Sequence, residues 1–248
     1  MTRRIDLNCD LGEGCANDAA IMPWITSANI ACGAHAGDAQ SMRATLRLCR
    51  QWGVCAGAHP GYPDREHFGR RELDSSPAQI AATLHAQLQQ LLDLAREEGV
   101  HVAHVKPHGA LYNQCARDPA LAATVATTIH AFDPGLILVG LAGSELPRAG
   151  LRAGLRVAHE AFADRRYLST GELASRSVAG AVIARVDDAV DQARSVALGT
   201  GVDSLDGVHL ALEADTLCVH GDGAHAADFA RSLREALNAA GVEVRSLV

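Results

Sequence analysis

The chain has few aromatic residues and no cluster of basic residues. Aromatic side chains make up 4% of its 248 residues, and its formal net charge is −7. Nucleic-acid binding relies on basic side chains at the phosphates, and on aromatic rings where single strands stack. The composition therefore argues against a nucleic-acid partner. No run of about 20 apolar residues occurs, so the sequence gives no reason to expect a membrane partner.

Several enzyme motifs are also missing. The sequence has no GxSxG elbow, no Walker A loop and no GxGxxG after a predicted strand, so neither a serine nucleophile nor a P-loop for ATP is supported. Its seven cysteines lack zinc-ribbon spacing, and several lie in apolar segments, as small buried residues do. With no apolar leader at the N-terminus, we expect a cytoplasmic protein with reduced thiols.

Apolar runs alternate with amphipathic segments along the whole chain, which predicts an α/β fold. Strands are expected at Ile5–Cys9, Ala28–Cys32, Val54–Ala58, Val102–Lys106, Leu136–Leu141, Arg156–Ala161, Thr216–Val219 and Val242–Leu247. Helices are expected at 38–52, 76–99, 118–132, 145–153, 187–199 and 224–240, and a short segment at 18–26, where Pro23 interrupts any long helix. No Pro/Gly/Ser linker divides the chain. We therefore expect one domain, residues 1–248, built as an irregular (β/α) barrel of seven or eight parallel strands.

Five segments end in the same way: an apolar run stops, and His, Asp or Lys follows beside a glycine. These segments are 5–14, 29–38, 54–61, 102–109 and 217–223. The carboxyl ends of parallel strands meet at one edge of a sheet, so these side chains should converge on one polar site. That convergence is the main reason to expect an enzyme.

The first strand offers three polar residues on one face. Period-2 alternation places Asp6, Asn8 and Asp10 together, and Glu13 follows the strand. In a barrel that face can line the lumen, where charged groups are costly unless they are paired or bind a ligand. A solvated face of an edge strand is the alternative interpretation.

The next two strand ends supply histidines. His35 and Asp38 follow the second strand, and His59 follows the third. With Asp10, the two histidines could bind a divalent metal, or they could transfer protons without one. Asp38 could instead be only the N-cap of the following helix.

The remaining candidates come from later strand ends and from a long charged loop. Lys106 and His108 follow the fourth strand, and a lysine at the end of an apolar strand suits an anion or a structural ion pair. The other candidates for substrate contact are Asn113, Glu160, Arg165, His220, Asp222 and, in the loop 60–75, Arg70. An arginine here could bind a substrate carboxylate in a bidentate manner.

Taken together, the sequence segments that carry these residues closely resemble the LamB/YcsF family, which is associated with the A subunit of bacterial 5-oxoprolinase. The matching stretches follow the family order and are 6–13, 27–33, 35–38, 57–61, 68–71, 105–113, 162–165 and 218–222. As a set they are highly specific and span nearly the whole chain. The loop after Glu13 is shorter than in many relatives, Ala34 stands where Phe is common, and residues 223–225 replace a frequent Thr-Pro pair.

The resemblance implies a barrel related to glycoside hydrolase and deacetylase-like folds. It further implies ATP-dependent hydrolysis of 5-oxo-L-proline to L-glutamate, with ATP used by a complex that includes partner subunits B and C. On this hypothesis Asp10 or His59 acts as base, His35 and His108 donate or orient protons, and Lys106 stabilises charge. Arg70 or Arg165 holds the substrate carboxylate. A stand-alone metal-dependent amide hydrolase or deacetylase, and a non-catalytic lactam-binding subunit, are the alternatives.

Overall fold

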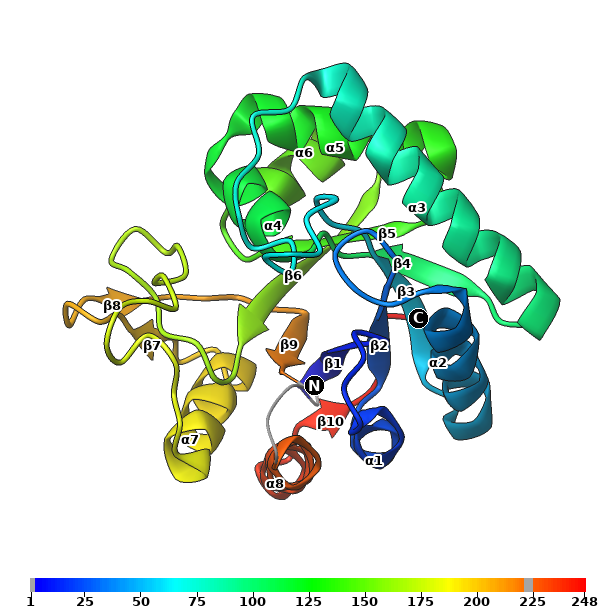
Figure 1. Cartoon of the computed structure of the whole chain (residues 1–248). Helices are drawn as coiled ribbons and strands as arrows, with labels where there is room; N and C mark the ends of the chain where they lie inside the picture. The colour runs from blue at the N-terminus through cyan, green and yellow to red at the C-terminus, as the bar shows by residue number, and fades with distance from the viewer. Residues whose placement is uncertain (1–2, 221–224) are drawn as a thin grey trace.

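The computed structural model describes residues 3–220 and 225–248, and its centre is a closed ring of seven parallel strands (Figure 1). The ring consists of β1 (Arg4–Leu11), β2 (Ser27–Ala31), β3 (Cys55–His59), β4 (Val102–Val105), β5 (Ile137–Leu141), β6 (Arg156–Phe162) and β9 (Thr216–Val219). Strand β9 closes it by pairing with both β6 and β1. The expected irregular (β/α) barrel is confirmed, with seven strands in the ring.

The helices lie outside the strands (Figure 1). They are α1 (Asp18–Ile21), the 3-10 turn η1 (Met22–Trp24), α2 (Ala39–Trp52), α3 (Pro77–Glu98), α4 (Gly109–Arg117), α5 (Pro119–Phe132), α6 (Glu145–Ala153), α7 (Val186–Ala197) and α8 (Ala226–Ala239). Asp38, Ser76 and Asp118 cap α2, α3 and α5 with their side chains, as local sequence predicts. Within the described ranges, no helix combines the length and apolarity that crossing a bilayer requires.

The structure differs from the sequence prediction in three places. Residues 109–117 form α4, where no helix was expected. The short strands β7 (Val202–Asp203) and β8 (His209–Leu210) pair antiparallel, away from the barrel (Figure 1). The last strand is only β10 (Glu243–Val244), and it pairs with Arg4 and Ile5 of β1, just before β1 begins to pair with β9. Strand β10 therefore extends the sheet beside the start of β1 and is not one of the seven strands that close the barrel.

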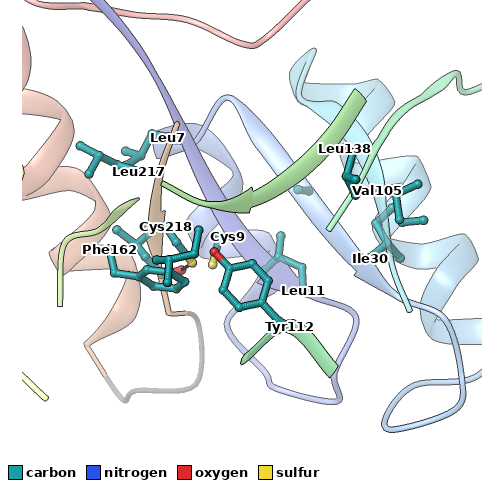
Figure 2. Close-up of a cluster of buried hydrophobic side chains, with 14 of the residues drawn as sticks. Leu7, Cys9, Leu11, Ile30, Val105, Tyr112, Leu138, Phe162, Leu217 and Cys218 are labelled. Atoms are coloured by element: carbon teal, nitrogen blue, oxygen red, sulfur yellow. Dashed lines mark hydrogen bonds between the residues drawn. The ribbon is translucent and has the colours of Figure 1, made fainter. Parts of the chain in front are cut away.

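Strand alternation separates an apolar layer from a polar lumen. Figure 2 shows apolar side chains of the layer between strands and helices, among them Leu7, Leu11, Ile30, Val105, Leu138 and Leu217. Asn8 and Asp10 alternate with the leucines of β1 and therefore face the lumen. Ile137, Val139 and Ala158 form a separate small apolar cluster with Leu247. The polar side chains concentrate at the carboxyl end of the ring.

Candidate active site

Lys106, directly after β4, is the centre of a buried ion-pair network. Its Nζ lies 3.0 Å from Asp10 Oδ1 and 2.8 Å from Glu160 Oε1, and it donates to Asn8 Oδ1 at 3.2 Å. Burial alone would lower the pKa of Lys106, but the carboxylates outweigh this and hold it well above its ordinary value. A lysine, two acids and an amide from β1, the end of β4 and β6 thus meet in the lumen.

Asp10 connects this network to the histidines. Its Oδ1 accepts a hydrogen bond from Asn29 Nδ2 at 2.8 Å, and its Oδ2 lies 3.2 Å from His59 Nε2. Burial would raise the pKa of Asp10, but His59 and Lys106 hold it well below its ordinary value. Asp10 is therefore a carboxylate at neutral pH, placed between an ammonium and an imidazole.

Three imidazoles and one carboxylate lie beside Asp10. We call Glu13, His35, His59 and His108 the histidine cluster; one potential ligand atom from each lies within 4.8 Å of the others. The rings of His35 and His108 stack with centroids 3.7 Å apart. Burial lowers the pKa of His35 to about 3 and that of His108 well below its usual range, while burial and Asp10 raise the pKa of Glu13.

Three buried polar atoms in the network and the histidine cluster lack a well-formed hydrogen bond within the described residues. They are His35 Nδ1, Tyr112 Oη and Glu160 Oε2, and the side chains of Tyr112 and Glu160 interact with each other. Burial and the Glu160 carboxylate raise the pKa of Tyr112 well above its ordinary value, so the phenol stays a donor. Leaving a buried polar group unpaired costs about 1–3 kcal/mol. A polar ligand in the lumen would relieve that cost.

A separate pair lies at the edge of the site. His220, directly after β9, places Nδ1 2.6 Å and 2.9 Å from the two oxygens of Asp164, and its ring stacks near Phe162. Burial would raise the pKa of Asp164, but His220 outweighs it and the pKa is lowered. The predicted site residue Asp222 lies outside the described residues, so the structure does not place it.

Four predicted site residues lie at the margin of the network and the histidine cluster or away from them. Asp38 is exposed and caps α2, and Asn113 is exposed on α4. The Arg165 guanidinium is buried, donates to the Ala174 carbonyl at 2.6 Å and leaves Nε without a partner among the described atoms. The Arg70 guanidinium lies 4.9 Å from the Phe68 ring centroid, and its charge offsets part of the rise in the pKa of Glu13 that burial and Asp10 cause. Arg70 is therefore near the site mouth.

Sequence reasoning missed several lumen residues that support the site. His104 Nε2 contacts Asn29 Oδ1 at 2.8 Å, and Thr216 Oγ1 accepts from Asn8 Nδ2 at 2.6 Å. Burial lowers the pKa of His104 to about 3, so it is neutral. The signal was present: His104 stands two residues before Lys106, hence on the same face of its strand. The same alternation that identified Asp6, Asn8 and Asp10 applies to every strand of the ring.

The fold and the site together define a class: a parallel (β/α) barrel with an enzyme-like cluster of acids, imidazoles and a lysine at the carboxyl ends of its strands. Within that class, the chain belongs to the LamB/YcsF family, whose model matches residues 5–248.

Named relatives agree with this assignment. Over 242 residues, which are 98% of this chain and 99% of the relative, it is 49% identical to a protein of Neisseria meningitidis named as the A subunit of 5-oxoprolinase. The solved lactam utilization protein from Thermus thermophilus is 43% identical, with a TM-score of 0.91 over 98% of this chain and all of that one. The peptidoglycan deacetylase PdaC from Bacillus subtilis has a TM-score of 0.51 at 14% identity over 99% of this chain and 88% of that one, a likeness of fold alone.

Proposed function

We propose that this chain is the lactam-hydrolysing subunit of an ATP-dependent 5-oxoprolinase, which converts 5-oxo-L-proline to L-glutamate. The observation that carries the proposal is the buried Asp10–Lys106–Glu160 network beside three imidazoles at the carboxyl edge of the barrel. The names of the Neisseria and Thermus relatives support the substrate class. In this proposal residues 1–248 act as one domain in the cytoplasm.

The chemistry explains why ATP and partners belong to the proposal. A five-membered lactam is a stable amide, and its opening at neutral pH needs coupling to ATP. Transfer of the γ-phosphoryl group of ATP to the lactam oxygen releases ADP and activates the ring carbon. Water then adds to that carbon, and the ring C–N bond breaks as the nitrogen takes up a proton. A second water releases phosphate from the resulting acyl phosphate and leaves L-glutamate. Because the chain carries no P-loop motif, we assign nucleotide binding to the complex with subunits B and C. This chain would then carry out the addition of water.

The geometry suggests roles for the central residues. Asp10, ionised and 3.2 Å from His59 Nε2, can act as the base that takes a proton from water, and His59 orients it. Lys106 faces both carboxylates and would stabilise negative charge that develops on the substrate. The stacked rings of His35 and His108 would orient the water or the substrate beside Asp10 and His59. Tyr112 Oη and Glu160 Oε2 are the buried atoms that a polar substrate would satisfy.

The carboxylate of the substrate needs a cation at the mouth of the barrel. Arg70 is our first choice, because it lies on the loop beside Phe68 and acts electrostatically on Glu13 and His35. Arg165 is the second, through its unpartnered Nε. Asn8, Glu13, Glu160 and His220 would line the same space, whereas Asp38 and Asn113 would contact substrate only if their segments moved. Asp222 stays a proposal from the sequence.

The test is reconstitution with subunits B and C, followed by measurement of glutamate formation and of 5-oxoproline-dependent ATP hydrolysis. Asp10→Asn, His59→Ala and Lys106→Ala should each lower turnover at least about 100-fold, the range for loss of a proton-transfer or charge-stabilising group. His209→Ala is the matched control, because His209 pairs with Asp203 in the exposed β7–β8 excursion. It should keep full turnover.

Two results would contradict the proposal. If all three variants retain full turnover, the site is wrong. If the complex binds 5-oxoproline and the variants alter binding but not turnover, this chain only binds the lactam, and the chemistry occurs elsewhere.

A further inference from the structure

The donor atoms of the histidine cluster are spaced as ligands of one metal ion are spaced. Glu13 Oε1 lies 3.3 Å from His35 Nε2 and 3.4 Å from His108 Nδ1, and His108 Nδ1 lies 2.9 Å from His59 Nε2. The carboxylate oxygen Oδ2 of Asp10, which lies 3.2 Å from His59 Nε2, is a fifth potential ligand atom. Two ligands held at about 2.0–2.1 Å in a tetrahedral site are about 3.3 Å apart. The three shortest separations within the histidine cluster match those of a coordination sphere, and all four of its potential ligand atoms lie within 4.8 Å of one another.

Backbone carbonyls fix which nitrogens carry protons. His59 Nδ1 is 2.7 Å from the Lys106 carbonyl oxygen, and His108 Nε2 is 2.9 Å from the Phe68 carbonyl oxygen. A carbonyl only accepts, so both of these nitrogens must be N–H donors. In the neutral rings, His59 Nε2 and His108 Nδ1 then present lone pairs to each other at 2.9 Å. Such a contact is repulsive unless a proton or a metal ion lies between them.

A metal ion accounts for more of the geometry than a proton does. One proton would join His59 to His108 and leave the approach of His35 and Glu13 unexplained. A central cation attracts all of these atoms at once. An outer N–H donated to a backbone carbonyl is also the usual way in which a ligating histidine is oriented, and both His59 and His108 are held in this way.

The charge balance favours a divalent cation. The carboxylates of Asp10 and Glu160 contact the one buried ammonium, that of Lys106, and a third carboxylate, that of Glu13, lies among the imidazoles of the histidine cluster. If all are ionised, these buried groups carry an excess of two negative charges, which is costly without a compensating cation. Imidazole and carboxylate ligands together suit zinc and its first-row neighbours.

We propose that Glu13, His35, His59 and His108, with Asp10 as an additional oxygen ligand, bind one divalent transition-metal ion, with Zn²⁺ as the first candidate. The sequence pointed to Asp10, His35 and His59; the structure adds Glu13 and His108. When bound, the ion would supply Lewis-acid activation of water or of a carbonyl oxygen. The metal site rests on the proposed function only for this role in turnover.

The experiment begins with elemental analysis of the purified full chain. The chain is then stripped with a chelator and titrated with Zn²⁺ by calorimetry, and separately loaded with Co²⁺ for visible spectroscopy. We expect saturable binding of one ion per chain and the strong Co²⁺ bands of a four- or five-coordinate site. His35→Ala, His59→Ala and Glu13→Gln should each weaken Zn²⁺ binding at least about 10-fold, the lower end of what loss of an outer-shell partner alone costs.

Controls separate this site from adventitious binding and from misfolding. His209→Ala removes an exposed histidine paired with an aspartate and should leave the Zn²⁺ affinity unchanged. Because a variant of a buried histidine can fail to fold, the Co²⁺ spectrum of the unaltered chain is an independent measurement. Absence of saturable Zn²⁺ binding, a spectrum like that of Co²⁺ in buffer, or affinity unchanged in folded cluster variants would each overturn the proposal.

Failure of the metal site and failure of the proposed function give different results. Suppose that the reconstituted complex hydrolyses the lactam while this chain holds no metal. That result would overturn the metal site and leave the proposed function intact. Zn²⁺ binding that depends on the cluster, in a chain whose complex does not open 5-oxoproline, would support the metal site and contradict the proposed function.

Discussion

At the scale of single residues, buried charge is concentrated in the lumen and each charge has a specific partner. Asp6 is the clearest case away from the proposed site. It is 2% exposed, and its carboxylate accepts hydrogen bonds from Thr26, Ser27 and Thr216. Burial raises its pKa despite those three hydroxyls. A buried carboxylate whose partners among the described residues are hydroxyls, and not a cation, makes the stability of the fold depend on pH.

The sign of that dependence follows from linkage. The folded state binds the Asp6 proton more tightly than the unfolded state does, so the stabilisation is complete below the unfolded pKa of about 4. It is lost as pH rises through the raised folded pKa. We therefore predict that the free energy of unfolding of the wild type, relative to Asp6→Asn, falls as pH rises from about 4. Urea unfolding at a series of pH values measures this. A difference that is constant or rises over that window would contradict the prediction.

At the scale of elements, side chains pack so closely inside the ring that some strand positions have room only for glycine. A Cβ on Gly57 of β3 would lie 2.0 Å from Nε2 and 2.2 Å from Cδ2 of His104 on β4. The imidazole therefore occupies the space that a side chain on β3 would need. This contact also explains why β3 carries a glycine among buried strand residues.

Gly57→Ala should destabilise the protein by about 1–3 kcal/mol or more, because the His104 ring must move and lose its contact with Asn29 Oδ1. Gly135→Ala is the matched control: Gly135 is exposed, and the nearest atom to its Cβ would be Asp133 Oδ1 at 3.1 Å, the far end of a flexible side chain. It should change stability by no more than about 0.5 kcal/mol. Chemical denaturation of both variants tests this, and equal effects would show that the lumen tolerates the methyl group.

At the scale of the whole molecule, the barrel closes between the first and last strands of the ring. Residues 6–9 of β1 pair with residues 216–219 of β9. Thr216 Oγ1 donates to Asp6 Oδ2 at 2.5 Å and accepts from Asn8 Nδ2 at 2.6 Å. One hydroxyl thus joins two lumen residues of β1 across the seam, more than 200 positions away in sequence.

Thr216→Val keeps the shape of the side chain and removes the hydroxyl, leaving buried groups of Asp6 and Asn8 with fewer partners. We expect a loss of about 1–3 kcal/mol in the free energy of unfolding. Thr127→Val on the exposed face of α5 is the control, and its effect should stay within about 0.5 kcal/mol. Equilibrium unfolding followed by circular dichroism measures both. A loss for Thr216→Val no larger than the control's would mean that the seam does not depend on this hydroxyl.

Much of the fold was predictable because its signals are local. Helix starts at Asp38, Ser76 and Asp118 depend on hydrogen bonds within a few residues. Helix α4 escaped prediction because its start at His108 has no side-chain cap and follows the strand-end motif directly. The antiparallel pair β7–β8 was not predicted, because strands of two residues give no periodic pattern.

The site was predictable in outline and not in its contacts. Asp10, His59, Lys106 and Glu160 follow from the rule that polar residues at carboxyl strand ends converge. Asn113 is the last residue of the matching stretch 105–113, but the helical turn carries it to the exposed face of α4. Neighbours in sequence therefore separate on a helix, and sequence adjacency to a motif does not place a side chain in the site.

The sequence by itself determined the elements, the strand ends and the kinds of side chain that meet at the barrel edge, because alternation and capping act within a few residues. Only the tertiary structure decided that His35, His59 and His108 meet with Glu13 around one point. Their separations depend on the pairing register of β1 through β4 and on the path of the loop at Phe68, whose carbonyl orients His108. Register and loop path are set by packing across the whole ring, which no local pattern encodes.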